Sequence, residues 1–352
     1  TPTATDPFIP RVETYVTGLE IPWALAFAPD GRLFLTERPG RIRLVVDGVL
    51  RPDPVATLPV AAVGEGGQMG LALDPAFESN GYLYVMYTYR AGNALRNRIA
   101  RLTLQGETAG DEHILLDGLP GASYHNGGRL AFGPDGALYA TTGDASQTAL
   151  AQQLDSLAGK ILRLNPDGSV PADNPFPGSL VYSYGHRNPQ GLAWHPETGA
   201  LYAPEHGPTG EMGLCCRDEL NRIEPGGNYG WPVVTGAPGD ARYVDPLLYS
   251  GPVITWAPAG VAYVNSPLLG DWNGSLLFGT LRGAHLHRAV LDPDTDGQSV
   301  LEDEALFVGE YGRIRDVVVG PDGALYLTTS NRDGRGTPTA DDDRVLRIVP
   351  AE

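Results

Sequence analysis

A short motif recurs along the whole chain: an apolar strand, a tight turn often spelled Pro-Asp-Gly, and a second strand that opens with leucine. Its clearest copies span residues 27–35, 132–139 and 319–326, and more divergent copies span 73–84, 194–202 and 272–278. The aligned leucines stand at positions 33, 83, 138, 201, 276 and 325, so the intervals are 50, 55, 63, 75 and 49 residues. Repeats of this length that each contain a hairpin are typical of propeller blades. The sequence therefore predicts a six-bladed β-propeller.

Two further apolar runs predict how the ring of blades closes. Arg344–Val349 follows the sixth hairpin, and Val12–Val16 lies near the start of the chain. If they pair in the last blade, they close the ring and protect edges that an open array would leave exposed. We expect one all-β domain over residues 11–352, made of four-stranded antiparallel blades, with residues 1–10 as an N-terminal tether.

The composition excludes some partners. The chain has 25 basic and 42 acidic residues, a formal net charge of −17 and a pI near 4.7. Such a surface repels nucleic acid and anionic lipid, and no apolar run approaches the ~18 residues that a membrane span requires. The polar start of the chain is similar to a tether left after signal-peptide removal. We therefore expect a periplasmic or extracellular protein, as a monomer or homodimer.

The only cysteines are the neighbours Cys215 and Cys216. Adjacent Cα atoms are ~3.8 Å apart, which is less than disulfide bonds usually span. We expect two free thiols, and the alternative is a bond between the neighbours, which would indicate an oxidising compartment.

One segment, Tyr124–Leu130, carries a histidine in front of two glycines and a strand. If the strands at 130–132 and 137–142 pair as a hairpin, Asp144 comes close to His125. A carboxylate beside an imidazole fixes its tautomer and raises its basicity, as a general base requires. The alternative is a structural hydrogen bond.

Polar segments flank the strands at similar places in their repeats, so in a propeller they should converge on one mouth of the channel. They include four arginines, which stand out in so acidic a chain: Arg187, Arg282, Arg313 and Arg315. Guanidinium groups bind carboxylates and phosphates through two hydrogen bonds at once. Convergence would indicate a polyanionic small ligand, and the alternative is pairing with acids at the rim.

Residues 218–221 and 226–232 combine carboxylates with a glycine-rich turn. Carboxylate and carbonyl oxygens are the ligands that calcium prefers. The pattern is compatible with a calcium site or with a solvated acidic turn.

Taken together, these motifs resemble the soluble sugar dehydrogenases that use pyrroloquinoline quinone (PQQ), the glucose/sorbosone and aldose sugar dehydrogenase group. The resemblance extends from about Val16 to Ile348 and rests on segments 21–23, 125–130, 185–192, 205–208, 228–232 and 313–316. It implies a six-bladed propeller, PQQ and calcium as cofactors, and oxidation of aldoses at C1 to lactones by hydride transfer to the quinone. The electron acceptor stays unidentified.

The resemblance also implies roles for particular residues. His125 matches the general base, Asp144 the carboxylate that orients it, and Arg187 with Asn188 the pair beside the reactive quinone carbonyl. The remaining implied cofactor contacts are Gln68, Arg282, Arg313 and Arg315. The carbonyls of Gly207 and Pro208 match ligands of a calcium ion that polarises the quinone. Glu219 and the carbonyl of Tyr229 match ligands of a second, structural ion.

The chain departs from the group between these two ion sites, where Thr209–Arg217 forms a longer loop that contains both cysteines. The loop would cover the cofactor, reshape the mouth or only enlarge the surface. Trp231, Trp256 and Tyr263 are candidate substrate contacts, with core packing as the alternative.

Two other functions compete with the dehydrogenase. A calcium-dependent lactonase-type propeller hydrolase has no need for four arginines. A non-catalytic binding propeller has no need for His125, Asp144 and Arg187.

Overall fold

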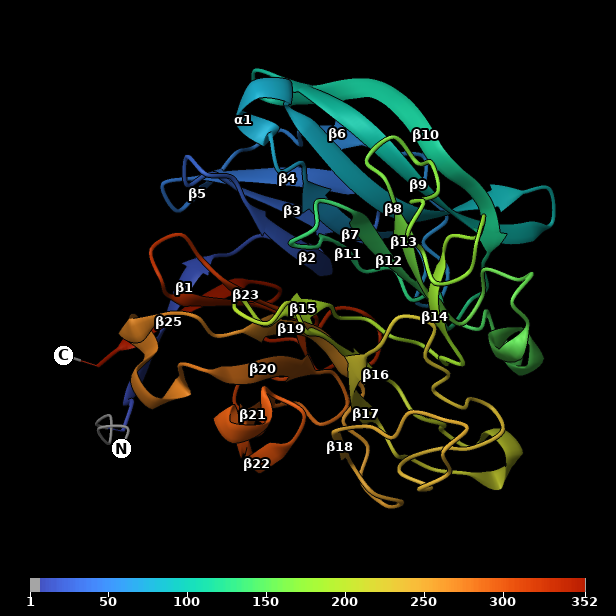
Figure 1. Cartoon of the computed structure of the whole chain (residues 1–352). Helices are drawn as coiled ribbons and strands as arrows, with labels where there is room; N and C mark the ends of the chain where they lie inside the picture. Colours follow the sequence, from blue (N-terminus) through green and yellow to red (C-terminus); the bar gives the residue numbers. More distant parts are fainter. Residues whose placement is uncertain (1–6, 352) are drawn as a thin grey trace.

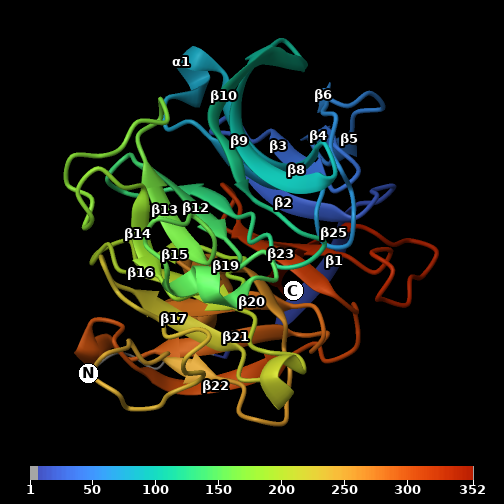
Figure 2. The same ribbon diagram turned by 90° about the vertical axis from the view of Figure 1, so that its right-hand side faces the viewer.

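The computed structural model describes residues 7–351, and within them the strands form six antiparallel sheets arranged around a ring (Figures 1 and 2). The predicted six-bladed propeller is confirmed. Six residues of the predicted tether, 1–6, lie outside the described residues, and Pro10 at its end already pairs with Pro350 in a sheet. Within the described residues, no helix is long and apolar enough to cross a membrane.

The first three blades follow one another along the chain. Blade 1 contains β2 (Pro22–Phe27), β3 (Leu33–Glu37), β4 (Arg41–Val46) and β5 (Val49–Leu50), with β6 (Ala56–Thr57) also paired to β4. Blade 2 contains β7 (Gln68–Leu73), β8 (Tyr82–Ala91), β9 (Ala94–Gln105) and β10 (Thr108–Pro120). Blade 3 contains β11 (Leu130–Phe132), β12 (Leu138–Thr142), β13 (Lys160–Leu164) and β14 (Val181–Tyr184).

The other three blades complete the ring. Blade 4 contains β15 (Ala193–Trp194), β16 (Leu201–Glu205), β17 (Glu219–Ile223) and β18 (Leu248–Tyr249). Blade 5 contains β19 (Pro258–Tyr263), β20 (Ser275–Thr280), β21 (Leu286–Leu291) and β22 (Val300–Leu306). Blade 6 contains β23 (Ile314–Val319), β24 (Leu325–Thr329), β25 (Val345–Pro350) and β1 (Pro10–Val16). The short helical turns are α1 (Phe77–Asn80), η1 (Thr148–Gln152), η2 (Glu211–Gly213), η3 (Pro267–Trp272) and η4 (Pro293–Thr295).

Blade 6 joins the two ends of the chain. The blue β1 lies beside the red β25 in Figure 1, and Val12 is opposite Ile348 in the antiparallel register. The predicted pairing of the N-terminal and C-terminal strands is confirmed. Because β1 pairs along β25, the edge of β25 is covered, and β1 is the outer strand of the last blade.

The recurring turn has a local explanation. In the copy at blade 3, the Asp135 carboxylate accepts the N–H of Ala137 at 3.1 Å and the hydroxyl of Tyr139 at 3.1 Å. Asp322 does the same for Ala324 and Tyr326 in blade 6, at 3.2 and 3.0 Å. The intervening Gly136 has φ of +75°, which side chains rarely adopt. The three residue types of the motif thus act together: the aspartate closes the turn and binds the tyrosine of the next strand, and the glycine adopts the backbone conformation that the turn needs.

The first strands of neighbouring blades lie side by side and form an inner ring; β2 contacts β7 and β23, and β19 contacts β15 and β23. A buried ion pair joins this inner ring, because Arg129, just before β11, donates to Asp316 of β23 at 3.0 Å. Asp316 also accepts the N–H of Leu25 in β2 at 2.8 Å, and the Arg129 guanidinium lies 4.6 Å from the ring centre of Trp23. One carboxylate therefore links blades 1, 3 and 6.

We predict that Asp316→Asn lowers the free energy of unfolding by about 3–5 kcal/mol, because it leaves the buried Arg129 without its counter-charge. Urea unfolding followed by fluorescence measures the change. Arg51→Gln, which removes an ion pair between exposed side chains with Glu107, serves as the control and should cost less than about 1 kcal/mol. Equal effects of the two variants would contradict a central role for the pair.

Candidate active site

One cleft of about 890 Å³ opens at a mouth of the channel. Loops from several blades line it, and they bring together the following residues: Glu65, His125, Arg187, His206, Gly207, Arg282, Arg313, Asn331 and Arg335. Five of them are site residues that the sequence predicts: His125, Arg187, Gly207, Arg282 and Arg313. The polar segments that were expected to converge therefore do so.

His125 and Asp144 form the expected pair. The imidazole Nδ1 lies 2.8 Å from Asp144 Oδ1, and Asp144 is fully buried. Ser146 N–H donates to the same oxygen, and Trp231 Nε1–H donates to Oδ2, both at 2.8 Å. A carboxylate that only accepts favours the tautomer with the proton on Nδ1, so the lone pair of Nε2 is directed away from Asp144. That nitrogen belongs to a side chain that lines the cleft.

The backbone of Arg187 is tied to the same pair. Its carbonyl accepts the N–H of Asp144 at 2.8 Å, and its own N–H donates to the Glu205 carboxylate. The guanidinium donates to the carbonyl of His206 at 3.3 Å and to the carboxylate of Glu211. The base, its carboxylate and the arginine are thus held by one hydrogen-bond network.

The other cleft arginines have different partners. Arg313 donates to Asp333 at 2.7 Å and to the Leu281 carbonyl at 3.0 Å. In the described part of the chain, no carboxylate lies within salt-bridge distance of Arg282. Pairing with acids thus occurs at Arg187 and Arg313 and leaves Arg282 available to a ligand.

Arg315, Gln68 and Asn188 are buried and do not line the cleft. Arg315 donates to Gln190 at 2.6 Å, and burial lowers its pKa to about 10. Within residues 7–351, the side-chain amide N and O of Gln68, Nδ2 of Asn188 and Nε of Arg315 have no hydrogen-bond partner, and the same holds for Nε of Arg187, which does line the cleft. An unsatisfied buried polar group costs about 1–3 kcal/mol. A polar ligand that reached these atoms would satisfy them.

The cleft also contains titratable side chains that sequence reasoning did not single out: Glu65, His206 and Arg335. Glu65 accepts from Arg335 at 2.8 Å and from the backbone N–H of His125 at 3.3 Å. Burial raises the pKa of Glu65, but nearby His206, Arg335 and His125 outweigh burial and lower it overall. Burial lowers the pKa of His206 to about 4. Both residues belong to polar segments beside strands, but their environment depends on contacts between blades.

The predicted calcium ligands occupy two places. Gly207 lines the cleft and donates its N–H to Asp218 at 2.8 Å, while the carbonyl of Pro208 accepts from Cys216 N–H at 3.3 Å. Glu219 pairs with Glu205 across β16 and β17 and accepts the N–H of Gly236 at 2.8 Å. Burial and the charge of Glu205 raise the pKa of Glu219 to about 8. Over residues 7–351 no three or more His, Cys, Asp or Glu side chains are grouped to hold a metal.

None of the three aromatic candidates is among the residues that line the cleft, although Trp256 stands between the lining residues Thr255 and Ala257. Trp231 holds Asp144, Trp256 packs 4.5 Å from His287, and Tyr263 packs 4.7 Å from His195, measured between ring centres. The ring of Tyr229, whose carbonyl was expected to bind an ion, stacks 4.6 Å from His186.

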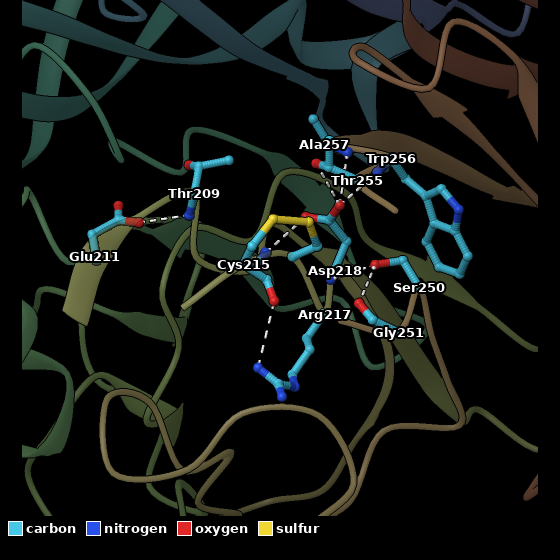
Figure 3. The surroundings of a disulfide bond; sticks show 12 residues. Thr209, Glu211, Cys215, Arg217, Asp218, Ser250, Gly251, Thr255, Trp256 and Ala257 are labelled. Carbon is cyan, nitrogen blue, oxygen red and sulfur yellow. Dashed lines mark hydrogen bonds between the residues drawn. A yellow bond between two sulfur atoms is a disulfide. The ribbon is translucent and has the colours of Figure 1, made fainter. Parts of the chain in front are cut away.

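The expectation of two free thiols is wrong, because Cys215 and Cys216 form a disulfide bond (Figure 3). Ordinary disulfides join Cα atoms that are farther apart than those of neighbouring residues. Here the surrounding loop closes on itself, with Gly210 N–H donating to the Leu214 carbonyl at 2.8 Å and Thr209 paired with Cys215. Cys216 has φ of +92°, so the chain turns sharply where the two side chains meet.

Comparison with known proteins agrees with this fold. The model of the glucose/sorbosone dehydrogenase family matches residues 19–339. The aldose sugar dehydrogenase YliI of Escherichia coli strain K12 is 34% identical over 351 residues, which cover 92% of this chain and 91% of the relative.

Two solved structures extend the comparison. A glucose dehydrogenase-type oxidoreductase of Thermus thermophilus superposes with a TM-score of 0.87 at 49% identity, covering 97% of this chain and 100% of the other. The PQQ-bound aldose sugar dehydrogenase of Streptomyces coelicolor has a TM-score of 0.85 at 40% identity, covering 97% and 99%. These matches identify a propeller oxidoreductase. The chain belongs to the glucose/sorbosone dehydrogenase family.

We predict that Asp144→Ala abolishes the low-field NMR resonance of the His125 Nδ1 proton, because that proton loses its acceptor. Proton NMR of protein with ¹⁵N-labelled histidine measures it. His186, whose Nδ1 lies 2.7 Å from Glu205, provides an internal control signal that should persist. An unchanged His125 signal would mean that another group holds the ring.

Proposed function

We propose that the protein oxidises aldose sugars at the anomeric carbon to lactones, with PQQ as the hydride acceptor. The observation that carries the proposal is the His125–Asp144 pair, whose free nitrogen belongs to a cleft rich in arginine. Family membership and the PQQ named in the Streptomyces relative support the same chemistry.

The residues around the cleft fit a tricarboxylated quinone. Among the described residues, Arg282 has no carboxylate partner, and Arg187, Arg315, Asn188 and Gln68 keep buried polar atoms that no hydrogen bond satisfies. Arginine binds carboxylates through charge-assisted hydrogen bonds, which are about twice as strong as neutral ones. We assign the binding of PQQ to these five residues together with Arg313.

When bound, PQQ supplies a two-electron acceptor for the hydride from C1. The protein's part is the proton: Nε2 of His125 takes it from the C1 hydroxyl as the C–H bond breaks. Asp144 keeps the other ring proton on Nδ1 and stabilises the imidazolium that forms. Arg187, whose carbonyl accepts the Asp144 N–H, holds its guanidinium on the same Glu211 oxygen that lies 3.7 Å from this base, and it would supply positive charge to stabilise the electrons that the bound quinone accepts.

Reconstitution of the apo-protein with PQQ and calcium tests the proposal. We expect aldose-dependent reduction of an artificial electron acceptor. Lactone hydrolysis without activity on any aldose would instead identify a propeller hydrolase, and binding of PQQ without either activity would identify a non-catalytic propeller.

We predict that His125→Ala lowers kcat by roughly 10²–10⁴-fold while PQQ still binds, because it removes the general base and no cofactor contact. Steady-state kinetics and PQQ titration measure the two effects. Equal losses of turnover and PQQ affinity would show that the histidine is structural.

We predict that Arg313→Gln with Arg315→Gln weakens PQQ binding at least tenfold, because each hydrogen bond to a charged group contributes about 1.5–3 kcal/mol. Calorimetric titration of the apo-protein measures the affinity. Arg242→Gln, which alters an exposed pair with Asp240, should leave it unchanged. Unaltered affinity in the double variant would place the cofactor elsewhere.

We propose calcium at two positions: at the carbonyls of Gly207 and Pro208, where it would act as a Lewis acid, and at Glu219 with the carbonyl of Tyr229. The second position has an electrostatic basis, because the half-buried Glu219 lies opposite the buried Glu205, whose charge helps to raise the pKa of Glu219. A divalent cation would neutralise both carboxylates.

We predict that calcium raises the midpoint of thermal unfolding of the wild type, by ligand linkage. Glu219→Gln should be at least as stable as the wild type without calcium, because it removes charge repulsion, and should gain less from calcium. Calorimetry with calcium or a chelator measures both. Equal gains in the two proteins would exclude Glu219 as a ligand.

The disulfide also supports an oxidising location, in the periplasm or outside the cell, since disulfides rarely persist in a reducing cytosol.

A further inference from the structure

The loop that departs from the family pattern places a carboxylate at the proposed reaction centre. Glu211, the first residue of η2, accepts a hydrogen bond from Nη2 of Arg187. The same oxygen, Oε1, lies 3.7 Å from Nε2 of His125, the nitrogen assigned to proton abstraction. The other oxygen accepts the N–H of Thr209 at 2.6 Å.

The loop Thr209–Arg217 is held in place by a disulfide, by hydrogen bonds within it and by hydrogen bonds to neighbouring segments. Besides the disulfide and the pairing of Gly210 with Leu214, the N–H of Arg217 donates to the Gly251 carbonyl at 2.8 Å. Figure 3 shows the Thr209–Glu211 contact on one side of the disulfide and the bonds of Asp218 on the other. Asp218 accepts the N–H groups of Gly207 and Trp256 at 2.8 and 2.6 Å, so it ties this loop to blade 5.

The groups around His125 differ in what they can do with a proton. Asp144 is fully buried and already accepts from Ser146 and Trp231. Glu65 accepts the backbone N–H of His125 and is bonded to Arg335. Arg187 can only donate. Among the described residues, only the carboxylate of Glu211 lies within 4 Å of Nε2.

Glu211 also connects the base with solvent. Its side chain is 31% exposed, against 13% for His125. Burial raises the pKa of Glu211, but the charge of Arg187 and hydrogen bonds to it outweigh burial, so the pKa is lowered overall. A proton received by such a carboxylate passes on to water readily, and the ionised form is restored.

Oxidation of one aldose to a lactone releases two electrons and two protons once the acceptor has removed the electrons. One proton starts on the C1 hydroxyl and arrives on His125. Each turnover therefore requires that the Nε2–H bond break before His125 serves again as a base.

We propose that Glu211 is a proton relay between His125 and solvent, which deepens and rests on the proposed dehydrogenase function. The Nε2–H bond of the imidazolium breaks, an O–H bond forms on Glu211, and the proton then transfers to water or a buffer base. No electrons move in this step.

The kinetic test compares the wild type with Glu211→Gln, which keeps the size and polarity of the side chain, and with Glu211→Asp. In dilute buffer we expect Glu211→Gln to lower kcat about 10-fold or more, with KM for the aldose changed less than threefold. Added imidazole should restore kcat in this variant and leave the wild type unaffected. Glu211→Asp should keep more activity than Glu211→Gln. Glu302→Gln, at an exposed position of β22, is the matched control and should leave kcat unchanged.

A second measurement needs no cofactor. ¹⁵N NMR of the apo-protein follows the His125 ring, and Glu211→Gln should shift the Nε2 resonance, because a negative charge 3.7 Å from Nε2 is lost. Asp144, Glu65, Arg187 and Arg335 stay in place in this variant, and Glu310→Gln, on the same cleft, should cause no shift.

The outcomes separate the two proposals. Unchanged kcat, or a loss that imidazole does not restore, overturns the relay while leaving the dehydrogenase function intact. A loss of kcat together with PQQ affinity also overturns it and makes Glu211 a positioning residue for Arg187. Wild-type protein inactive on all aldoses overturns the dehydrogenase function, and the relay with it, even if the NMR shift is found.

Discussion

The propeller depends on buried carboxylates that accept N–H groups where blades meet. The first strand of each blade is an edge strand of its sheet, so part of its backbone has no sheet partner, and a buried donor there must be satisfied. Asp316 accepts from Leu25 and from Arg129, joining three blades. Asp218 joins blade 4 to blade 5 through Trp256, and Asp343 joins the last blade to the first through Ile21. The ring is closed by charge-assisted hydrogen bonds as well as by pairing of β1 with β25.

The same device builds the candidate active site. Asp144 is a buried acceptor like Asp316, but one of its donors is the imidazole of His125. Its other donors, Ser146 and Trp231, belong to different loops, so the ring orientation of the histidine is held by elements that the fold itself fixes. A base oriented this way loses little entropy when substrate binds, which favours catalysis. Buried aspartates that accept hydrogen bonds therefore both join the blades and orient the proposed base.

The fold could be predicted from the sequence because its signal is local. Asp135 and Tyr139 act within one turn and one strand, so the clearest copies of the motif carry the same residues at the same spacing. The closeness of His125 to Asp144 follows from a hairpin of known length, and it too was predictable. The geometry at Cys215–Cys216 was not, because it depends on how the loop folds back on Pro208 and Gly251.

The contacts that sequence reasoning could not find are those between distant segments. Glu65 meets Arg335 across 270 positions, and Gln68 is buried although its motif lies at the mouth. Glu211 is the clearest case, because its loop was recognised as a departure but its side chain had no assigned role. The loop between β16 and β17 emerges at the mouth that the cleft occupies, where loops of other blades also lie. It therefore reaches residues of other blades directly and brings a carboxylate to within 3.7 Å of Nε2 of the proposed base.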